Sequence, residues 1–189
     1  ALMYGNVTQD EAKQMGKTLK DVLLAGVTPG QRLVSTTRVI EASGGPTLDV
    51  SIDHNDSVLL AYYQGQATMD EQARYLLLGQ LISTPFFTEL RTKQQLGYVV
   101  SGRYHRVEHS PGMRFLIQST KADPTKLLER VDAFLAERPA ILAAMPDAEF
   151  EQSRAGLMST LLEKDNTLVE RFQRYQQDLH LQVTSFDRR

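Results

Sequence analysis

Apolar residues recur along this chain at two different spacings, which divide it into a β section flanked by helical sections. The segments 57–64, 97–104 and 113–120 are short apolar runs bounded by turn residues, a pattern typical of strands. The first run is nearly continuous, so we predict that it is a central strand covered on both faces. Shorter runs, two of them alternating between polar and apolar residues, predict additional strands at 1–5, 36–42 and 48–52.

Helical spacing of apolar residues follows several capping signals. Thr8 with Glu11, and Thr68 with Glu71, form capping boxes, and helices are expected after both. Further helices are predicted to begin near residues 123, 146 and 166. Two prolines are expected to interrupt this pattern, because proline lacks the backbone N–H that a helix interior uses. We predict that Pro85 opens a separate short helix capped by Thr84, and that Pro139 ends the helix that begins at residue 123.

The order of these elements predicts an α+β fold. Strands that follow one another directly pair antiparallel, and the helices are then expected to pack on one face of the sheet. Thr28-Pro29-Gly30 reads as a linker. We therefore predict a division of the chain into residues 1–31 and residues 32–189.

Composition excludes several classes of protein. The chain has 189 residues and a net charge of −2, so it lacks the basic surplus that marks nucleic-acid-binding domains. It has no cysteine, which excludes disulfides and thiolate metal sites. Its apolar runs are too short to span a bilayer. We expect neither a nucleic acid nor a membrane as a partner.

The segment from Leu90 to Val100, together with 84–89 before it and 113–119 after it, carries a specific resemblance. It resembles the pitrilysin and insulin-degrading-enzyme family of zinc metallopeptidases, and within that family the last of four homologous domains. The resemblance implies a LuxS/peptidase-type α+β fold. It also implies that residues 1–31 are the closing strand and helix of the preceding domain, and that the following domain is truncated.

Two positions, Arg91 and Tyr98, match the family's substrate-contacting pair, and Gly97 lies beside them. The resemblance implies catalytic and substrate-binding roles for Arg91 and Tyr98, and a role for Gly97 in letting the substrate backbone approach closely. From the residues alone, two structural interpretations stay open. Arg91 is also suited to satisfying carbonyl groups at a helix C-terminus, and Tyr98 to packing as a strand aromatic in the core.

A second motif, His105-Arg106-Val107-Glu108-His109, spells the H-x-x-E-H signature that holds zinc in this family. That signature works on a helix, where residues four apart share one face. Here it follows a predicted strand and precedes Ser110-Pro111-Gly112, so we expect a hairpin loop. The family's third ligand, a glutamate about seventy to eighty residues further on, is missing from 179–189. We therefore predict no metal site in this chain.

The resemblance implies that the chain is the C-terminal, non-zinc-binding portion of a zinc metalloendopeptidase that encloses and hydrolyses peptides. The zinc and the N-terminal half of the same polypeptide complete the enzyme, and this chain alone is expected to be inactive. Two alternatives stay open: a non-catalytic scaffold or peptide-binding homologue, and a relative that processes the pyrroloquinoline quinone precursor peptide. Resemblance to bacterial members favours a periplasmic location over a cytoplasmic one. Apolar residues on the first and last helices predict self-association, namely Met15, Leu19, Leu23 and Phe172.

Overall fold

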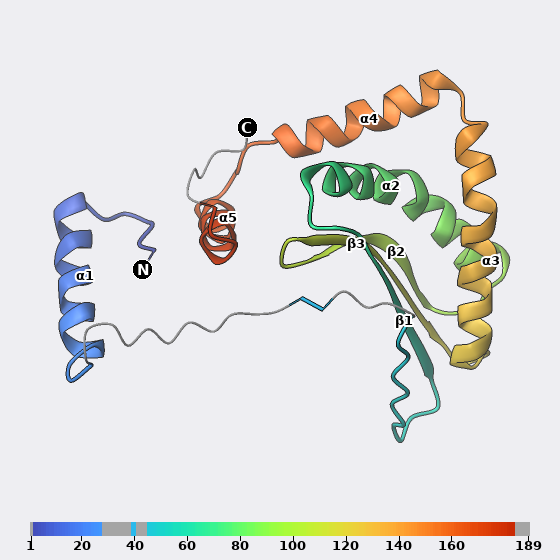
Figure 1. Ribbon diagram of the computed structural model, residues 1–189, viewed down its shortest axis with the longest axis horizontal. Coiled ribbons are helices and arrows are strands. Elements are labelled where there is room, and N and C mark those ends of the chain that lie inside the picture. Colours follow the sequence, from blue (N-terminus) through green and yellow to red (C-terminus); the bar gives the residue numbers. More distant parts are fainter. Residues whose placement is uncertain (1, 28–38, 41–44, 184–189) are drawn as a thin grey trace. The chain divides into compact units, whose positions relative to one another are not determined.

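A computed structural model describes residues 2–27, 39–40 and 45–183 of the chain (Figure 1). These residues fall into two compact units. The larger unit spans the described residues between 39 and 162, and the smaller unit combines 2–27 with 163–183. The predicted strand at 36–42 lies outside the described residues except for Val39 and Ile40, which have no regular structure. The proposed division of the chain at residue 31 remains a prediction.

The larger unit is built on an antiparallel sheet. Among the described residues, its strands are β1 (Ser57–Gln64), β2 (Val99–Val107) and β3 (Ser110–Ser119), in the order β1-β3-β2. Ser57 of β1 pairs with Ser119 of β3, and Val99 of β2 pairs with Gln118 of β3. The predicted α+β class with an antiparallel sheet is confirmed.

Within the described sheet, the 57–64 strand does not have the predicted central position. In the described sheet β3 lies between its neighbours, and β1 pairs on one side only. The burial of the strands agrees with this order, since β1 alternates between exposed and half-buried residues whereas β3 is mostly buried. A continuous apolar run reports how hydrophobic a strand is, but not which strand pairs on both edges.

Two further strand predictions are wrong. Residues 2–5 and 45–56 contain no strand in the described chain. The apolar side chains of the second segment are turned to solvent, with Leu48 86% exposed, Val50 71% and Ile52 61%. Alternation predicts which side chains would share a face, but a strand forms only where a neighbouring backbone supplies the hydrogen bonds.

Helices cover one face of the sheet. α2 (Met69–Phe87) contacts β2 and β3, and α3 (Pro124–Ala143) contacts β1 (Figure 1). α4 (Asp147–Leu162) packs against α2. Alternate residues of β3 face the helices and form one buried cluster with them. The buried members are Ile82, Phe86, Leu90, Val100, Met113, Phe115, Ile117, Leu127, Val131 and Phe134. The predicted placement of helices on one face is therefore confirmed.

Neither proline ends a helix, contrary to prediction. Pro85 lies inside α2 and Pro139 lies inside α3. Proline in a helix interior costs about 3 kcal/mol. Burying one large apolar side chain contributes about 1.5–3 kcal/mol, and both Phe86 and Leu90, which follow Pro85, are 0% exposed. At Pro85, packing in the core thus offsets the lost backbone hydrogen bond.

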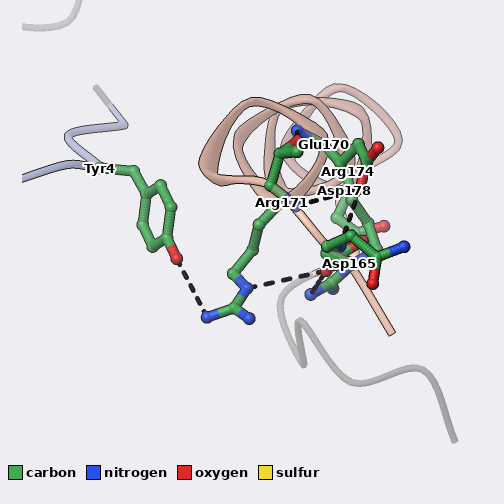
Figure 2. A network of polar contacts seen from close by, with 8 residues as sticks. Tyr4, Asp165, Glu170, Arg171, Arg174 and Asp178 are labelled. Atoms are coloured by element: carbon green, nitrogen blue, oxygen red, sulfur yellow. Dashed lines mark hydrogen bonds and ion pairs between the residues drawn. The ribbon is translucent and has the colours of Figure 1, made fainter. Parts of the chain in front are cut away.

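The smaller unit joins the N-terminal segment to the last helix. It contains α1 (Gln9–Leu23) and α5 (Leu168–His180). Arg171 of α5 donates to the hydroxyl of Tyr4 at 3.2 Å (Figure 2). The rings of Tyr4 and Tyr175 meet edge to face at 5.3 Å. Asp165, with a side chain 5% exposed, pairs with Arg174 at 2.9 Å. These contacts explain why residues far apart in the sequence form one unit.

The apolar face of α1 is open to solvent. Met15 is 48% exposed, Leu19 45% and Leu23 69%, whereas Phe172 of α5 is half-buried. Self-association through these side chains remains a prediction. No helix among the described residues is both long and apolar enough to cross a membrane.

Candidate functional site

The segment that links α2 to β2 is a π-helix, η1 (Thr88–Lys93), which sequence analysis did not predict. The amide of Gln94 donates to the carbonyl of Glu89 at 3.0 Å, five residues back, and Leu96 donates to Leu90 at 3.0 Å. Leu90 is completely buried and anchors this widened turn in the core. π-Helical turns are rare and recur at functional sites, because they redirect side chains that a regular helix would align.

Arg91 lies in η1 and is half-buried. The neighbouring charges pair with one another, since Glu89 accepts from Lys93 at 2.9 Å and from Gln94 at 3.1 Å. These hydrogen bonds hold the pKa of the Glu89 carboxyl below its usual range. Within the described part of the chain, no hydrogen bond or ion pair engages the Arg91 side chain and none joins it to Tyr98. The Arg91 guanidinium can therefore offer its donors to a bound molecule.

Tyr98 lies immediately before β2 and is 52% exposed. The alternative that Tyr98 is a core aromatic is therefore wrong. Its backbone is fixed to β3, because its amide donates to the carbonyl of Gln118 at 3.1 Å. Its hydroxyl donates to Oδ2 of Asp56, and Nε2 of Gln118 donates to the same oxygen at 2.8 Å. An aromatic side chain is thus held at the surface by a polar cluster at the end of the sheet.

Asp56 is the centre of this cluster. Its side chain is 9% exposed, and Nδ1 of His54 lies 3.8 Å from its Oδ1. Its backbone amide donates to that same Nδ1 at 3.0 Å. The hydrogen bond from Tyr98, followed by that from Gln118, outweighs burial and lowers the pKa of the Asp56 carboxyl. The same bond is the main cause of the raised pKa of the Tyr98 phenol.

Sequence analysis missed this cluster. The sequence patterns indicated no role for Asp56, Gln118 or His54. One signal was available: Asp56 directly precedes the first strand, and Gln118 lies near the end of the last. Antiparallel pairing of those two strands brings the two positions together.

Gly97 lies against its own sheet. A Cβ at this position would stand 2.2 Å from the carbonyl oxygen of Gln118 and 3.2 Å from Cγ2 of Ile117. The structure thus gives a reason for glycine here that does not involve substrate, namely the close approach of two backbones. The role of Gly97 in substrate approach remains a prediction.

The H-x-x-E-H pentad spans the end of β2 and a tight turn. His105 belongs to β2, whereas Glu108 and His109 form the turn into β3. The expected non-helical context is confirmed, although the loop is shorter than predicted because both strands extend into it. Burial, with the charges of Arg114 and Arg103, lowers the pKa of His105. The described residues contain no group of three or more His, Cys, Asp or Glu side chains able to hold a metal.

The chain is similar in sequence to a family of known proteins and to several individual relatives. Residues 77–176 match the family described as PQQ synthase PqqF-like, C-terminal lobe domain 4. The chain is 32% identical over 177 residues to a nardilysin-like protein of Arabidopsis thaliana, covering 89% of the chain and 17% of that protein. It is 28% identical over 190 residues to Protease 3 of Escherichia coli (strain K12), covering 100% of the chain and 20% of that protein.

A third relative is the insulin-degrading enzyme of Drosophila melanogaster, 32% identical over 136 residues, with 71% of the chain and 14% of the enzyme covered. The crystal structure of pitrilysin superposes with a TM-score of 0.77 at 28% identity, covering 97% of this chain and 20% of that one. The chain thus spans about a fifth of the length of the relatives that it matches. Sequence and fold agree that the chain belongs to the pitrilysin and insulin-degrading-enzyme family of peptidases, as the fourth domain in its C-terminal lobe.

Proposed function

We propose that this domain completes the active site of a zinc metalloendopeptidase, where Tyr98 and Arg91 contact the peptide that is cleaved. The observation that carries the proposal is the placement of Tyr98. Tyr98 is 52% exposed although its backbone and hydroxyl are both held in place. A phenol anchored in this way at the domain surface can face a substrate bound by another part of the enzyme.

The chemistry of peptide hydrolysis suits these two side chains. Attack on the scissile peptide group builds negative charge on its carbonyl oxygen, and a phenol donates a hydrogen bond that strengthens as that charge develops. A guanidinium presents a planar fork of donors and stays charged at any relevant pH. Arg91 can therefore bind carbonyl groups of an extended peptide both before and during the reaction.

The proposal is tested with Arg91→Ala in the complete peptidase, assayed with a quenched fluorescent peptide. We expect kcat/KM to fall, with a rise in KM as well as a loss of kcat, because contacts to carbonyl groups exist in the ground state too. Arg91→Lys keeps the charge without the fork and should recover only part of the activity. The proposed contact would be contradicted if Arg91→Ala had wild-type kcat and KM.

The residues that the structure describes do not fit a zinc site, and we propose that the N-terminal half of the enzyme holds the metal. We therefore expect no stoichiometric zinc to remain on this chain after dialysis, as measured by elemental analysis. Histidines four residues apart converge on a metal when they share a helix face, whereas His105 and His109 lie on a strand and in a turn. One tightly held zinc ion, lost on His105→Ala, would show that this strand-and-turn pentad binds metal.

A second candidate is processing of the pyrroloquinoline quinone precursor peptide. The description of the matched family, which names a PQQ synthase PqqF-like protein, favours it. Both candidates use the same two side chains, so they differ only in substrate. Cleavage of the precursor peptide, measured against unrelated peptides of equal length and charge, separates them: a preference for the precursor of tenfold or more in kcat/KM would favour the specialised enzyme.

A further inference from the structure

The hydroxyl of Tyr98 has one proton, and in this structure that proton is already engaged. A phenol offers a single O–H donor and acts as an acceptor through its remaining lone pairs. Here the donor points to Oδ2 of Asp56. In this state Tyr98 presents only acceptor sites to a bound peptide, and it has no hydrogen bond left to give to a carbonyl oxygen.

The acceptor is held more firmly than the donor. The Asp56 side chain is 9% exposed and accepts a hydrogen bond from Nε2 of Gln118 at 2.8 Å. The Asp56 backbone amide donates to Nδ1 of His54 at 3.0 Å. Gln118 belongs to β3, which lies between its neighbours in the described sheet. The lowered pKa of the Asp56 carboxyl keeps it ionised near neutral pH, and hydrogen bonds to charged acceptors are stronger than those between neutral groups. When the hydrogen bond between Asp56 and Tyr98 breaks, we therefore expect the Tyr98 side chain to move and Asp56 to stay in place.

The Tyr98 side chain is placed to rearrange. Tyr98 is 52% exposed and does not belong to the buried cluster, so rotation of its ring removes no contact of that cluster. The backbone bond from its amide to Gln118 at 3.1 Å does not depend on the direction of the hydroxyl. Exchange of one acceptor for another thus requires a side-chain rotation and no change of fold.

We propose that Asp56 is a positioning residue of this site, which competes with the reacting carbonyl oxygen for the hydrogen bond from Tyr98. This inference rests on the proposed function of Tyr98. Substrate binds first to a tyrosine whose proton faces Asp56, and the bond transfers to the carbonyl oxygen as negative charge develops there. Only a fraction of the enzyme molecules therefore has the Tyr98 hydroxyl directed at the substrate. The observed kcat is lowered in proportion to that fraction.

The experiment replaces the charged acceptor in the complete peptidase. Asp56→Asn should raise kcat roughly two- to ten-fold, because a neutral acceptor binds the phenol more weakly. In a Tyr98→Phe background the same change should have no effect on kcat, since there is no hydroxyl to release. Asp53→Asn is the matched control. It removes the same charge from the segment that precedes β1, and within the described residues no hydrogen bond or ion pair joins Asp53 to Tyr98.

Each outcome distinguishes this inference from the function on which it rests. If Tyr98→Phe leaves kcat intact, the proposed function fails. If Tyr98→Phe lowers kcat but Asp56→Asn leaves kcat unchanged or reduces it, the function stands and competition by Asp56 is wrong. Thermal melts of the same samples identify a folding defect. Asp56→Ala removes the acceptor altogether and should also raise kcat. If Asp56→Ala does not raise kcat, competition by Asp56 is again excluded.

Discussion

In the complete peptidase, Tyr98→Phe is expected to lower kcat roughly ten- to a thousand-fold with little change in KM. The substitution removes one oxygen and leaves the ring. A hydrogen bond to the carbonyl oxygen matters mainly when that oxygen carries negative charge, so its loss raises the energy of the transition state and hardly affects substrate binding. Steady-state kinetics on a quenched peptide measure both constants.

Tyr104→Phe is the matched control for this experiment. Tyr104 lies on β2, half-buried against α2 near Gly79, and the same oxygen can be removed there without touching the Tyr98 cluster. We expect wild-type kcat for Tyr104→Phe. A Tyr98→Phe enzyme that melts at the wild-type temperature and turns over at the wild-type rate would remove the central assignment of the proposed site.

Gly97→Ala is expected to lower the free energy of unfolding by about 1–3 kcal/mol, the usual range for overpacking. The added Cβ would stand 2.2 Å from the carbonyl oxygen of Gln118, an oxygen that also accepts the amide of Tyr98 at 3.1 Å. Neither group is the end of a flexible side chain, so the start of β2 must move away from β3. Urea denaturation measures the loss, and kcat should fall with it because Tyr98 moves too.

Gly156→Ala is expected to raise the free energy of unfolding, opposite to Gly97→Ala. Gly156 lies within α4, and the nearest atom to an added Cβ is Nε2 of Gln80 at 3.9 Å, an ordinary contact. Alanine is a better helix former than glycine, and this change should stabilise by about 0.5–1 kcal/mol. If Gly97→Ala were as stable as Gly156→Ala, the close approach at Gly97 would not constrain the fold.

Much of the local structure was readable from neighbouring residues alone. The side chains of Thr8 and Thr68 cap the starts of α1 and α2, and Leu127 and Val131, four residues apart on α3, both lie in the core. These features depend on residues three or four apart, whose interaction is set by helix geometry. The α+β class followed from the order of the elements.

The resemblance carried by Leu90–Val100 located the candidate site but not its geometry. It singled out Arg91 and Tyr98, yet it indicated neither the π-helix that carries Arg91 nor the partner of the Tyr98 hydroxyl. The π-helix arises because Leu90 is buried and Leu96 bonds back to it, and that burial is a property of the packed domain.

Tertiary contacts decided the features that sequence patterns predicted wrongly or missed. Pro85 stays within α2 because the residues after it are buried, and β1 lies beside only one described strand because β3 pairs with both others. The Asp56 cluster joins residues 42 and 62 positions apart. The spacing of apolar residues indicates which side chains of one element share a face. It does not indicate which elements contact one another. Partners this distant become neighbours only when the strands pair, so the site was defined by the sheet.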